Sequence, residues 1–402
     1  MTTTRFAPDF RLLINDSPVP AQMRASISSV TYTSGLEGAD RVEIALVNQQ
    51  LRWLDHPLLA FDNQLTLLIG YAPNELTQVF VGNIIAHSAN FPASGLPTLS
   101  VAAQDRKENL QQGSKVRWFA VPTPSIGNFP LPDMAVAGIV AVENGLIPIF
   151  EPVGAALSVL LGGIELAVAI DDSAKLQNLI RKQQAESDYD FLKRIAAQNG
   201  WEMVIEHTGP LAGRQLRFMS PLDHLAPDVI LKYGQSLIEF SPRVSTVGQI
   251  ISISAYVWVA ELKTTFTVTV GWDWDRMSLT IDVRPEFVPL GQGPSDYLIE
   301  EPVTAASAPR ILISKLIPRL NNRLTGSGST IGDPRIRAGS VLRLDGLGVQ
   351  FGGLYRVVSA THNIDSGGYR TNFDVRKEIW FGSIPMPEQG AVPIRVNAPF
   401  VS

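Results

Sequence analysis

Residues 333–377 read DPRIRAGSVLRLDGLGVQFGGLYRVVSATHNIDSGGYRTNFDVRK. Apolar and polar residues alternate over 342–345 and again over 372–376, which places the apolar side chains of each stretch on one face, as in a half-buried strand. Glycines break the chain between 346 and 353, and DSGG at 365–368 can adopt the positive φ of a hairpin before a strand at 369–377. The stretch therefore predicts antiparallel sheet, closed or covered, and contains no catalytic constellation.

The composition of the whole chain limits the classes of protein to consider. With 402 residues and 45% hydrophobic content, the chain can bury a sizeable core and is long enough for two to four domains. The absence of cysteine excludes disulfides, thiolate metal sites and cysteine nucleophiles. A formal net charge of -5 argues against a general electrostatic attraction to nucleic acid or anionic lipid. We therefore expect a folded multi-domain protein without direct nucleic-acid binding.

The pattern of strands and turns divides the chain into four sections. Strand-like alternation interrupted by turns dominates the first section, as at 41–46 and 64–69, and the third, as at 250–259 and 265–270. We predict a fold that is mainly β with α+β insertions. The sections are a first antiparallel β-barrel at 1–112, a middle α/β domain at 113–229, a second β-barrel at 230–385 and an extended C-terminal arm at 386–402.

The middle section carries the clearest helix signal. Ser187 can cap a helix that has two aspartates in its first turn and an apolar stripe, and Gly200 ends it before a strand at 201–207. The most apolar stretch, 147–170, is interrupted by two glutamates and a proline, which is unsuitable for a membrane-spanning helix. We read 154–169 as a buried or interface-facing helix or hairpin and expect no membrane insertion.

The third section contains an insertion at about 286–332. Its residues 314–324 read as a helix in which Pro318 fits only the first turn or a kink. The following GSGS at 326–329 lacks the lysine of a phosphate-binding loop and reads as a flexible connection before the final sheet.

Several motifs together resemble one known family. GSVLRLDGLGVQFGGLYRVVSATH at 339–362, followed by DSGGYRTNFDVR at 365–376, resembles the C-terminal half of the phage late control D proteins, a tail hub family that includes the hub portion of type VI spike proteins. Further segments resemble the family in the same order along the chain. They are FVGNI at 80–84, FPASG at 91–95 with LSV at 99–101, ESDYDFLKRI at 186–195, and KYGQSL at 232–237 with FSPR at 240–243.

The resemblance implies a structural role without catalytic, cofactor-binding or metal residues. In this family two tube-like barrels per chain form a homotrimeric, pseudo-sixfold ring that joins a hexameric tail tube to a trimeric central spike, beside other baseplate components. We expect the spike to be a separate chain, because this sequence ends after a short arm. The N-terminus lacks a signal-peptide pattern, so we expect synthesis in the cytoplasm and assembly into a particle. Phage, bacteriocin and extracellular injection particles share these motifs.

An enzyme or carbohydrate-binding module is the alternative interpretation. In the sequence GWDWD at 271–275, a strand would place Asp273 and Asp275 on one face, with their tryptophan neighbours on the other. Alternate residues on a strand lie roughly 7 Å apart, within the range of glycosidase carboxylate pairs. The competing interpretation is a solvated face at the end of a strand, which is the commoner use of paired acids.

The histidines give no local metal or catalytic pattern. No two of them are spaced by three or four residues, so a metal site would need long-range convergence. His207 follows Glu206, but neighbouring strand residues point to opposite faces, and His362 suits a structural hydrogen bond at a strand end. The histidines are His56, His87, His207, His224 and His362.

Overall fold

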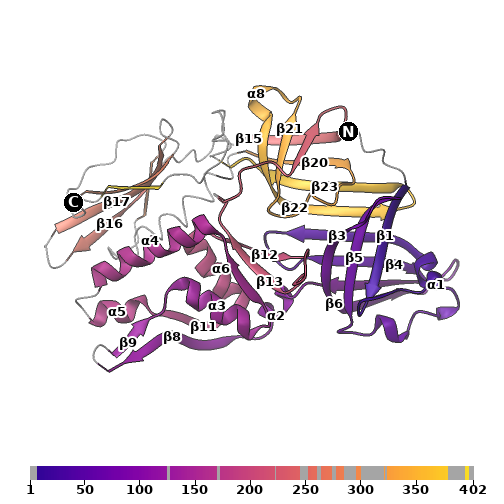
Figure 1. The fold of residues 1–402 in the computed structure, drawn as a ribbon, viewed down its shortest axis with the longest axis horizontal. Coiled ribbons are helices and arrows are strands. Elements are labelled where there is room, and N and C mark those ends of the chain that lie inside the picture. Colours follow the sequence, from indigo (N-terminus) through magenta and orange to yellow (C-terminus); the bar gives the residue numbers. More distant parts are fainter. Residues whose placement is uncertain are drawn as a thin grey trace.

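The computed structural model describes most of the chain (Figure 1). The described residues are 7–124, 127–169, 173–221, 223–244, 252–259, 264–273, 278–284, 296–299, 321, 324–378 and 394–397. The fold is mainly β, with antiparallel pairing dominant and helices concentrated in the middle of the sequence. The predicted fold class is confirmed in this respect. The division into two barrels and the exact section boundaries stay predictions.

A sheet of thirteen strands combines strands from residues 7–104 with strands from residues 229–376. Its order is β15-β20-β23-β22-β3-β4-β7-β6-β5-β1-β2, with β14 and β21 attached beside β22. The connection between early and late segments is antiparallel pairing of β22 with β3, which runs from Ser359 opposite Gly35 to Ile364 opposite Val30. In Figure 1 the indigo N-terminal strands accordingly lie against the yellow C-terminal strands. The regions predicted as separate barrels thus share continuous backbone pairing.

The strands of this sheet follow the predicted alternation. Phe373 and Val375 on β23 are buried while Asn372 and Asp374 are exposed, and the predicted hairpin forms between β22 and β23. The bounds are β1 Ala7–Ile14, β2 Ser17–Pro18, β3 Ile27–Gly35, β4 Arg41–Val47, β5 Gln64–Ala72, β6 Thr77–Asn90, β7 Thr98–Gln104, β14 Val229–Lys232, β15 Leu237–Val244, β20 Leu324–Ile331, β21 Val341–Asp345, β22 Gly353–Asp365 and β23 Gly368–Arg376. Short helices lie in the connections between strands of this sheet: α1 Ala21–Ser26, η1 Gln49–Leu51, η2 Pro57–Leu59 and α8 Gly348–Phe351.

Two hydrophobic cores lie against this sheet. The core of the N-terminal part packs aliphatic side chains of β3 to β7 around Phe80 and Tyr32, and Tyr369 from β23 joins it. The core of the C-terminal part packs Tyr355 and Phe373 with aliphatic residues of β14, β21 and β22. Burial of these side chains is the main stabilising contribution, on the order of 1.5–3 kcal/mol for each large apolar group.

The GSGS segment is a strand, not the flexible connection that we predicted. Residues 326–329 lie inside β20, which pairs with β15 on one side and β23 on the other. A Cβ on Gly326 would lie 2.7 Å from the Phe240 ring, and one on Gly328 would lie 2.8 Å from the Phe373 ring. The glycines are therefore explained by aromatic rings that occupy the space of their missing side chains.

The middle region is built from two small sheets and a group of helices (Figure 1, magenta). The sheets have the orders β11-β8-β9 and β10-β13-β12. Helix α6 begins as predicted, with the Ser187 hydroxyl accepting from the Asp190 N–H, and ends at Gly200 with φ 67°. The bounds are α2 Lys107–Gln111, β8 Lys115–Thr123, β9 Gly127–Pro130, α3 Asp133–Glu143, β10 Ile147–Phe150, α4 Pro152–Ala169, α5 Ser173–Leu179, β11 Arg181–Glu186, α6 Asp188–Asn199, β12 Glu202–Glu206 and β13 Gln215–Met219.

The apolar stretch of the middle region forms α4, in agreement with the helical alternative of our prediction. Leu157 and Leu161 of this helix are buried, whereas Val159 is 67% exposed. Within the part of the chain that the structure describes, no helix has the length and apolar character needed to span a membrane.

A separate five-stranded sheet has the order β19-β16-β17-β18-β24. It confirms strands near 250–259 and 265–270, and Asp273 is the last residue of β17. Asp275 lies outside the described residues, as does nearly all of the helix predicted at 314–324; Leu324 itself begins β20. The bounds are β16 Ser252–Val259, β17 Thr264–Asp273, β18 Ser278–Arg284, β19 Asp296–Ile299 and β24 Ile394–Asn397.

Candidate functional site

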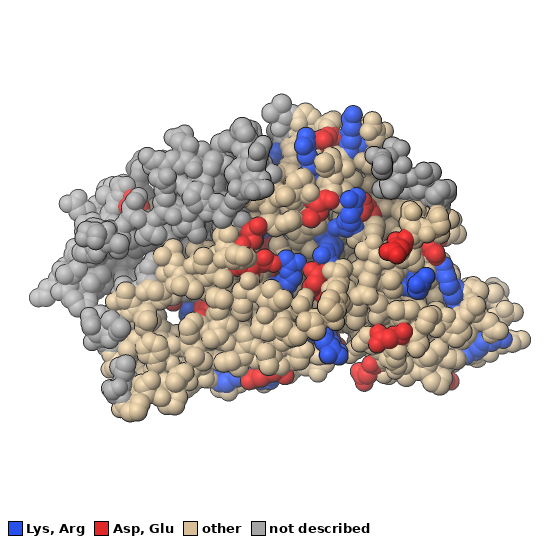
Figure 2. Space-filling model, viewed as in Figure 1, with Lys and Arg blue, Asp and Glu red and all other residues tan. Residues whose placement is uncertain are grey.

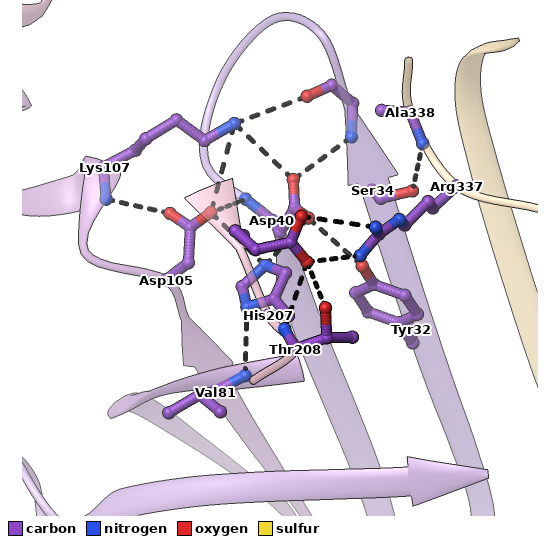
Figure 3. A network of polar contacts seen from close by, with 12 residues as sticks. Tyr32, Ser34, Asp40, Val81, Asp105, Lys107, His207, Thr208, Arg337 and Ala338 are labelled. Atoms are coloured by element: carbon purple, nitrogen blue, oxygen red, sulfur yellow. Dashed lines mark hydrogen bonds and ion pairs between the residues drawn. The ribbon is translucent and has the colours of Figure 1, made fainter. Parts of the chain in front are cut away.

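A buried polar cluster marks the place where the N-terminal sheet meets the middle region (Figure 3). Asp40 lies in the turn between β3 and β4, and Asp105 lies between β7 and α2. Lys107 is the first residue of α2, and His207 follows β12. All four side chains are almost completely buried. Buried charges are rare unless they are paired, so this cluster is a candidate functional site.

The hydrogen bonds of His207 determine which ring nitrogen carries the proton. Its Nδ1 accepts from the backbone N–H of Val81 at 3.2 Å, so a neutral ring carries its proton on Nε2. Nε2 lies 3.1 Å from Asp40 Oδ2 and donates to it. The Tyr32 hydroxyl donates to the same oxygen at 3.2 Å, and the Gly35 N–H donates to the other at 3.2 Å. Asp40 is therefore held by donors from three directions.

Lys107 supplies the positive charge of the cluster. Its Nζ lies 3.6 Å from Asp40 Oδ1 and 4.0 Å from Asp105 Oδ2, and it donates to the Gly35 carbonyl at 3.4 Å. Asp105 in turn accepts from the backbone N–H groups of Lys107 at 2.9 Å and Asp40 at 3.1 Å. The cluster thus ties two turns of the N-terminal sheet to each other as well as to the middle region.

The two carboxyl groups differ in acidity. Burial raises the pKa of Asp105 to about 6, and the charge of Asp40 adds to this effect while Lys107 opposes it. Burial also acts on Asp40, but the Lys107 ammonium and the His207 hydrogen bond outweigh it and lower its pKa. The surrounding carboxylates raise the pKa of Lys107 despite its burial. Among the described residues, Lys107 is therefore the only ammonium that faces both buried carboxylates, and Asp105 takes up a proton at a higher pH than an exposed aspartate does.

The same side chains are close enough together to be considered as metal ligands. One ligand atom each from Asp40, Asp105 and His207 lies within 4.8 Å of the others. However, the Lys107 ammonium already faces both carboxylates, and His207 presents an N–H rather than a lone pair toward Asp40. A metal ligand must offer its lone pair, so these residues fit a proton and ammonium network and not a metal.

A cavity of about 440 Å³ borders the cluster and is lined by Asp40 and His207 together with the ion-paired residues Glu206, Arg217 and Arg337. Glu206 on β12 bonds Arg217 of β13 at 3.0 Å and Arg337 of the 333–377 stretch at 2.8 Å. Arg337, with the Thr208 hydroxyl and N–H, lowers the pKa of Glu206 to about 2 in spite of its burial. Figure 2 shows acidic and basic side chains gathered in the middle of the visible face. These ion pairs connect β12, β13 and the 333–377 stretch, and both carboxylate oxygens of Glu206 are bonded.

The structure separates the residues that the sequence singled out. His207 enters the buried cluster, whereas His362 stacks on Tyr32 and bonds the Tyr369 hydroxyl and the Ile336 carbonyl, each at 2.8 Å. The predicted structural role of His362 is confirmed, although β22 continues three residues beyond it. His56, His87 and His224 contribute no atom to the convergent group of Asp40, Asp105 and His207. The pairing of Asp273 with Asp275 stays untested.

Sequence reasoning missed the aspartates and the lysine of the cluster. Asp40 comes immediately before Arg41 on β4, and Asp105 comes immediately after Gln104 on β7. Arg41 and Gln104 are paired across the two strands. The only signal was therefore that both acids lie at the same end of two strands. Using it would have required the pairing partner and register, which no local pattern supplies.

Comparisons with known proteins show where this architecture occurs. No family model and no curated protein sequence matches the chain. Among solved structures, the 43 kDa tail protein of prophage MuSo2 from Shewanella oneidensis superposes with a TM-score of 0.60 at 13% identity, covering 92% of this chain and 98% of that one. A tail protein from Neisseria meningitidis MC58 gives 0.58 at 9% identity, with 92% and 97% covered.

The chain has the fold of phage tail proteins. The E. coli c3393 protein shares this tail-protein fold with a TM-score of 0.52 at 9% identity, covering 93% of this chain and 79% of that one. That protein is described as a component of the type VI secretion system with similarity to the T4 tail proteins gp27 and gp5. The resemblance to the tail hub family, first indicated by sequence motifs, is thereby confirmed at the level of the fold.

Proposed function

We propose that this chain is the structural hub of a contractile phage tail or a related injection particle. The observation that carries the proposal is the tail-protein fold over nearly the full length of both this chain and the Shewanella protein. In this role three copies form a pseudo-sixfold ring that joins the hexameric tail tube to a separate trimeric spike. Its partners are itself, the tube, the spike and other baseplate components.

The polar cluster supports a structural rather than a catalytic role. The carboxylates of the cluster and of Glu206 are occupied by lysine, arginine, histidine or backbone donors. A general acid or base needs a free position for the substrate proton, and these carboxylates are already bonded to cations or N–H donors of the chain. We therefore assign no catalytic, cofactor-binding or metal residue, and we place the protein in the particle after synthesis in the cytoplasm.

An edge strand offers one contact for the ring. β15 ends the path of the thirteen-stranded sheet, and no described strand pairs with its outer edge. Ile238 and Val244 of this strand are 46% and 38% exposed. Unpaired edges are liabilities that natural proteins cover, and a neighbouring copy covers them in a closed ring.

The oligomeric state tests this function directly. The purified chain, alone or co-expressed with its tube and spike proteins, is expected to run as a trimer by native mass spectrometry. Replacing Ile238 and Val244 together by lysine is expected to shift the trimer toward monomer, because the new charges oppose edge pairing. Val159→Lys, at an exposed site on α4, is the matched control and is expected to leave the trimer intact. A chain that stays monomeric and binds neither tube nor spike contradicts the proposal.

A further inference from the structure

The small sheet β11-β8-β9 of the middle region exposes a tryptophan and a valine to solvent (Figure 1). Val116 and Trp118 lie two residues apart on β8, and their side chains are 74% and 67% exposed. Phe119, the next residue, points to the opposite face and is buried in the core of the middle region. The inner face of β8 therefore packs against the core, whereas its outer face presents two large apolar groups that the described part of the chain leaves uncovered.

The adjacent strand β11 adds a positive charge to this outer face. Lys182 is the pairing partner of Trp118, and its ammonium lies 5.5 Å from the centroid of the Trp118 ring. Gln184 pairs with Val116 in the same way, so the four side chains lie together on one side of the sheet. Among the described residues, no carboxylate forms an ion pair with Lys182. We call Val116, Trp118, Lys182 and Gln184 the Trp118 patch.

A groove of about 400 Å³ runs beside the Trp118 patch and shares Lys182 and Gln184 with it. Among the described residues that line the groove, Glu186 is the single carboxylate, and it already bonds Arg194. Arg181 also lines the groove, but its guanidinium is paired with carboxylates of α3 and α4 at 2.6 and 3.4 Å. Lys182 is thus the cation of the groove that is available to an incoming carboxylate, and the described lining offers no unpaired carboxylate to an incoming cation.

The edge of β11 is not suited to pairing with an added strand. β11 ends the order of its sheet, but the Lys182 carbonyl accepts from the Arg194 guanidinium at 2.9 Å. A bulge at Ala185, where φ is 51°, shifts the register within the strand. Bulges and covered edge groups are means by which edge strands prevent strand addition. A partner of the Trp118 patch therefore binds through its side chains on the face of the sheet.

We propose that the Trp118 patch binds an acidic segment of another protein. An apolar side chain of that segment packs on Val116 and Trp118, and a carboxylate of the segment pairs with Lys182. Tryptophan is enriched among the residues that contribute most to binding energy, because it buries a large apolar area. The inference goes beyond the hub function and does not rest on it.

Charge complementarity selects this occupant over the others. A basic segment would meet the Lys182 ammonium and, in the described lining, no unpaired carboxylate. A second copy of this chain that used the same patch in a twofold contact would bring two Lys182 ammoniums together. Surfaces that bind anionic membranes carry clusters of basic residues, whereas the Trp118 patch carries one.

Two short fluorescein-labelled peptides serve as probes, one alternating glutamate with leucine and the other alternating lysine with leucine. Their affinities for the full chain are measured by fluorescence anisotropy at low ionic strength, where charge contributions are largest. The glutamate peptide is expected to bind and the lysine peptide is not. Trp118→Ser is expected to weaken binding of the glutamate peptide about tenfold or more. Phe91→Ser is the matched control, since Phe91 is an aromatic residue outside the patch that is 58% exposed, and binding is expected to be unchanged.

Charge reversal tests the role of Lys182. Lys182→Glu is expected to weaken binding of the glutamate peptide about tenfold and to create binding of the lysine peptide, a gain that misfolding cannot produce. Lys232→Glu reverses an exposed lysine on β14 and is the matched control. Its preference for the glutamate peptide is expected to match that of the native chain.

The inference is overturned if the native chain binds neither peptide, binds both equally, or keeps its affinity for the glutamate peptide after Trp118→Ser. Phosphatidylglycerol vesicles that bind the native chain but not the Trp118→Ser variant would assign the patch to a membrane instead. A native trimer that Trp118→Ser dissociates, as seen by native mass spectrometry, would assign it to a contact between copies. The oligomeric state of the native chain tests the hub function separately, so failure of either proposal is distinguishable from failure of the other.

Discussion

Lys107 holds a buried ammonium beside two carboxylates, so its removal tests the polar cluster. Lys107→Met is expected to lower the free energy of unfolding by about 3–5 kcal/mol, because Asp40 and Asp105 would lose their cation inside the protein. The measurement is urea denaturation at neutral pH. Lys193→Met is the control, since the Lys193 ion pair with Glu37 is exposed, and a change within about 0.5 kcal/mol is expected. Similar losses in both variants would show that the cluster carries no special stability.

The burial of His362 predicts how the stability of the protein depends on pH. Burial lowers its pKa to about 4, below the usual value of 6.5 in an unfolded chain. A neutral buried histidine contributes stability that is complete above pH 6.5 and is lost as the pH falls toward 4. The loss between pH 8 and 4.5 is expected to be about 2–3 kcal/mol.

The contribution of His362 is isolated by comparison with His362→Gln. Glutamine keeps one donor and one acceptor but does not titrate in this range. Asp105, whose pKa is raised to about 6, acts in the opposite direction, since its protonation favours the folded state as the pH falls. That contribution is common to both proteins. The stability difference between them should therefore shrink on acidification, and a constant difference from pH 8 to 4.5 would refute the assignment.

At the scale of the element, β20 shows how a strand tolerates glycine. Gly328→Val would drive a side chain into the Phe373 ring and the Glu239 carbonyl, 2.8 and 2.9 Å from the ideal Cβ. We expect a loss of about 1–3 kcal/mol in the free energy of unfolding, measured by urea denaturation. The neighbouring residue Ser327 is exposed on the other face of β20. Ser327→Val is therefore expected to lower the free energy of unfolding by less than about 0.5 kcal/mol. Equal losses in the free energy of unfolding for Gly328→Val and Ser327→Val would mean that packing does not require glycine at position 328.

At the scale of the whole molecule, Arg337 connects the 333–377 stretch to the middle region through Glu206. Arg337→Met removes this connection while Arg217 continues to bond Glu206. Because Arg337 is partly exposed, the expected loss is modest, about 1–2 kcal/mol. Hydrogen exchange should show faster exchange in β12 and in residues 336–341, with α6 unchanged.

The control for Arg337 is Arg343→Met, since Arg343 pairs only locally with Asp345 at an exposed site. Its hydrogen exchange should change near β21 alone. Exchange that rises equally across α6 in the Arg337→Met protein would indicate general destabilisation rather than loss of a specific connection between regions.

The sequence by itself determined the elements whose causes are local. Alternation of apolar and polar residues is a property of neighbouring positions, and it located β4, β5, β21 and β23. A serine cap, an apolar stripe and a terminal glycine likewise located α6. Only the tertiary structure decided that β22 pairs with β3, that His207 meets Asp40, and that rings fill the space beside Gly326 and Gly328. These contacts join residues far apart in the chain, and their partners and register depend on the packing of the whole fold, which no single stretch of sequence encodes.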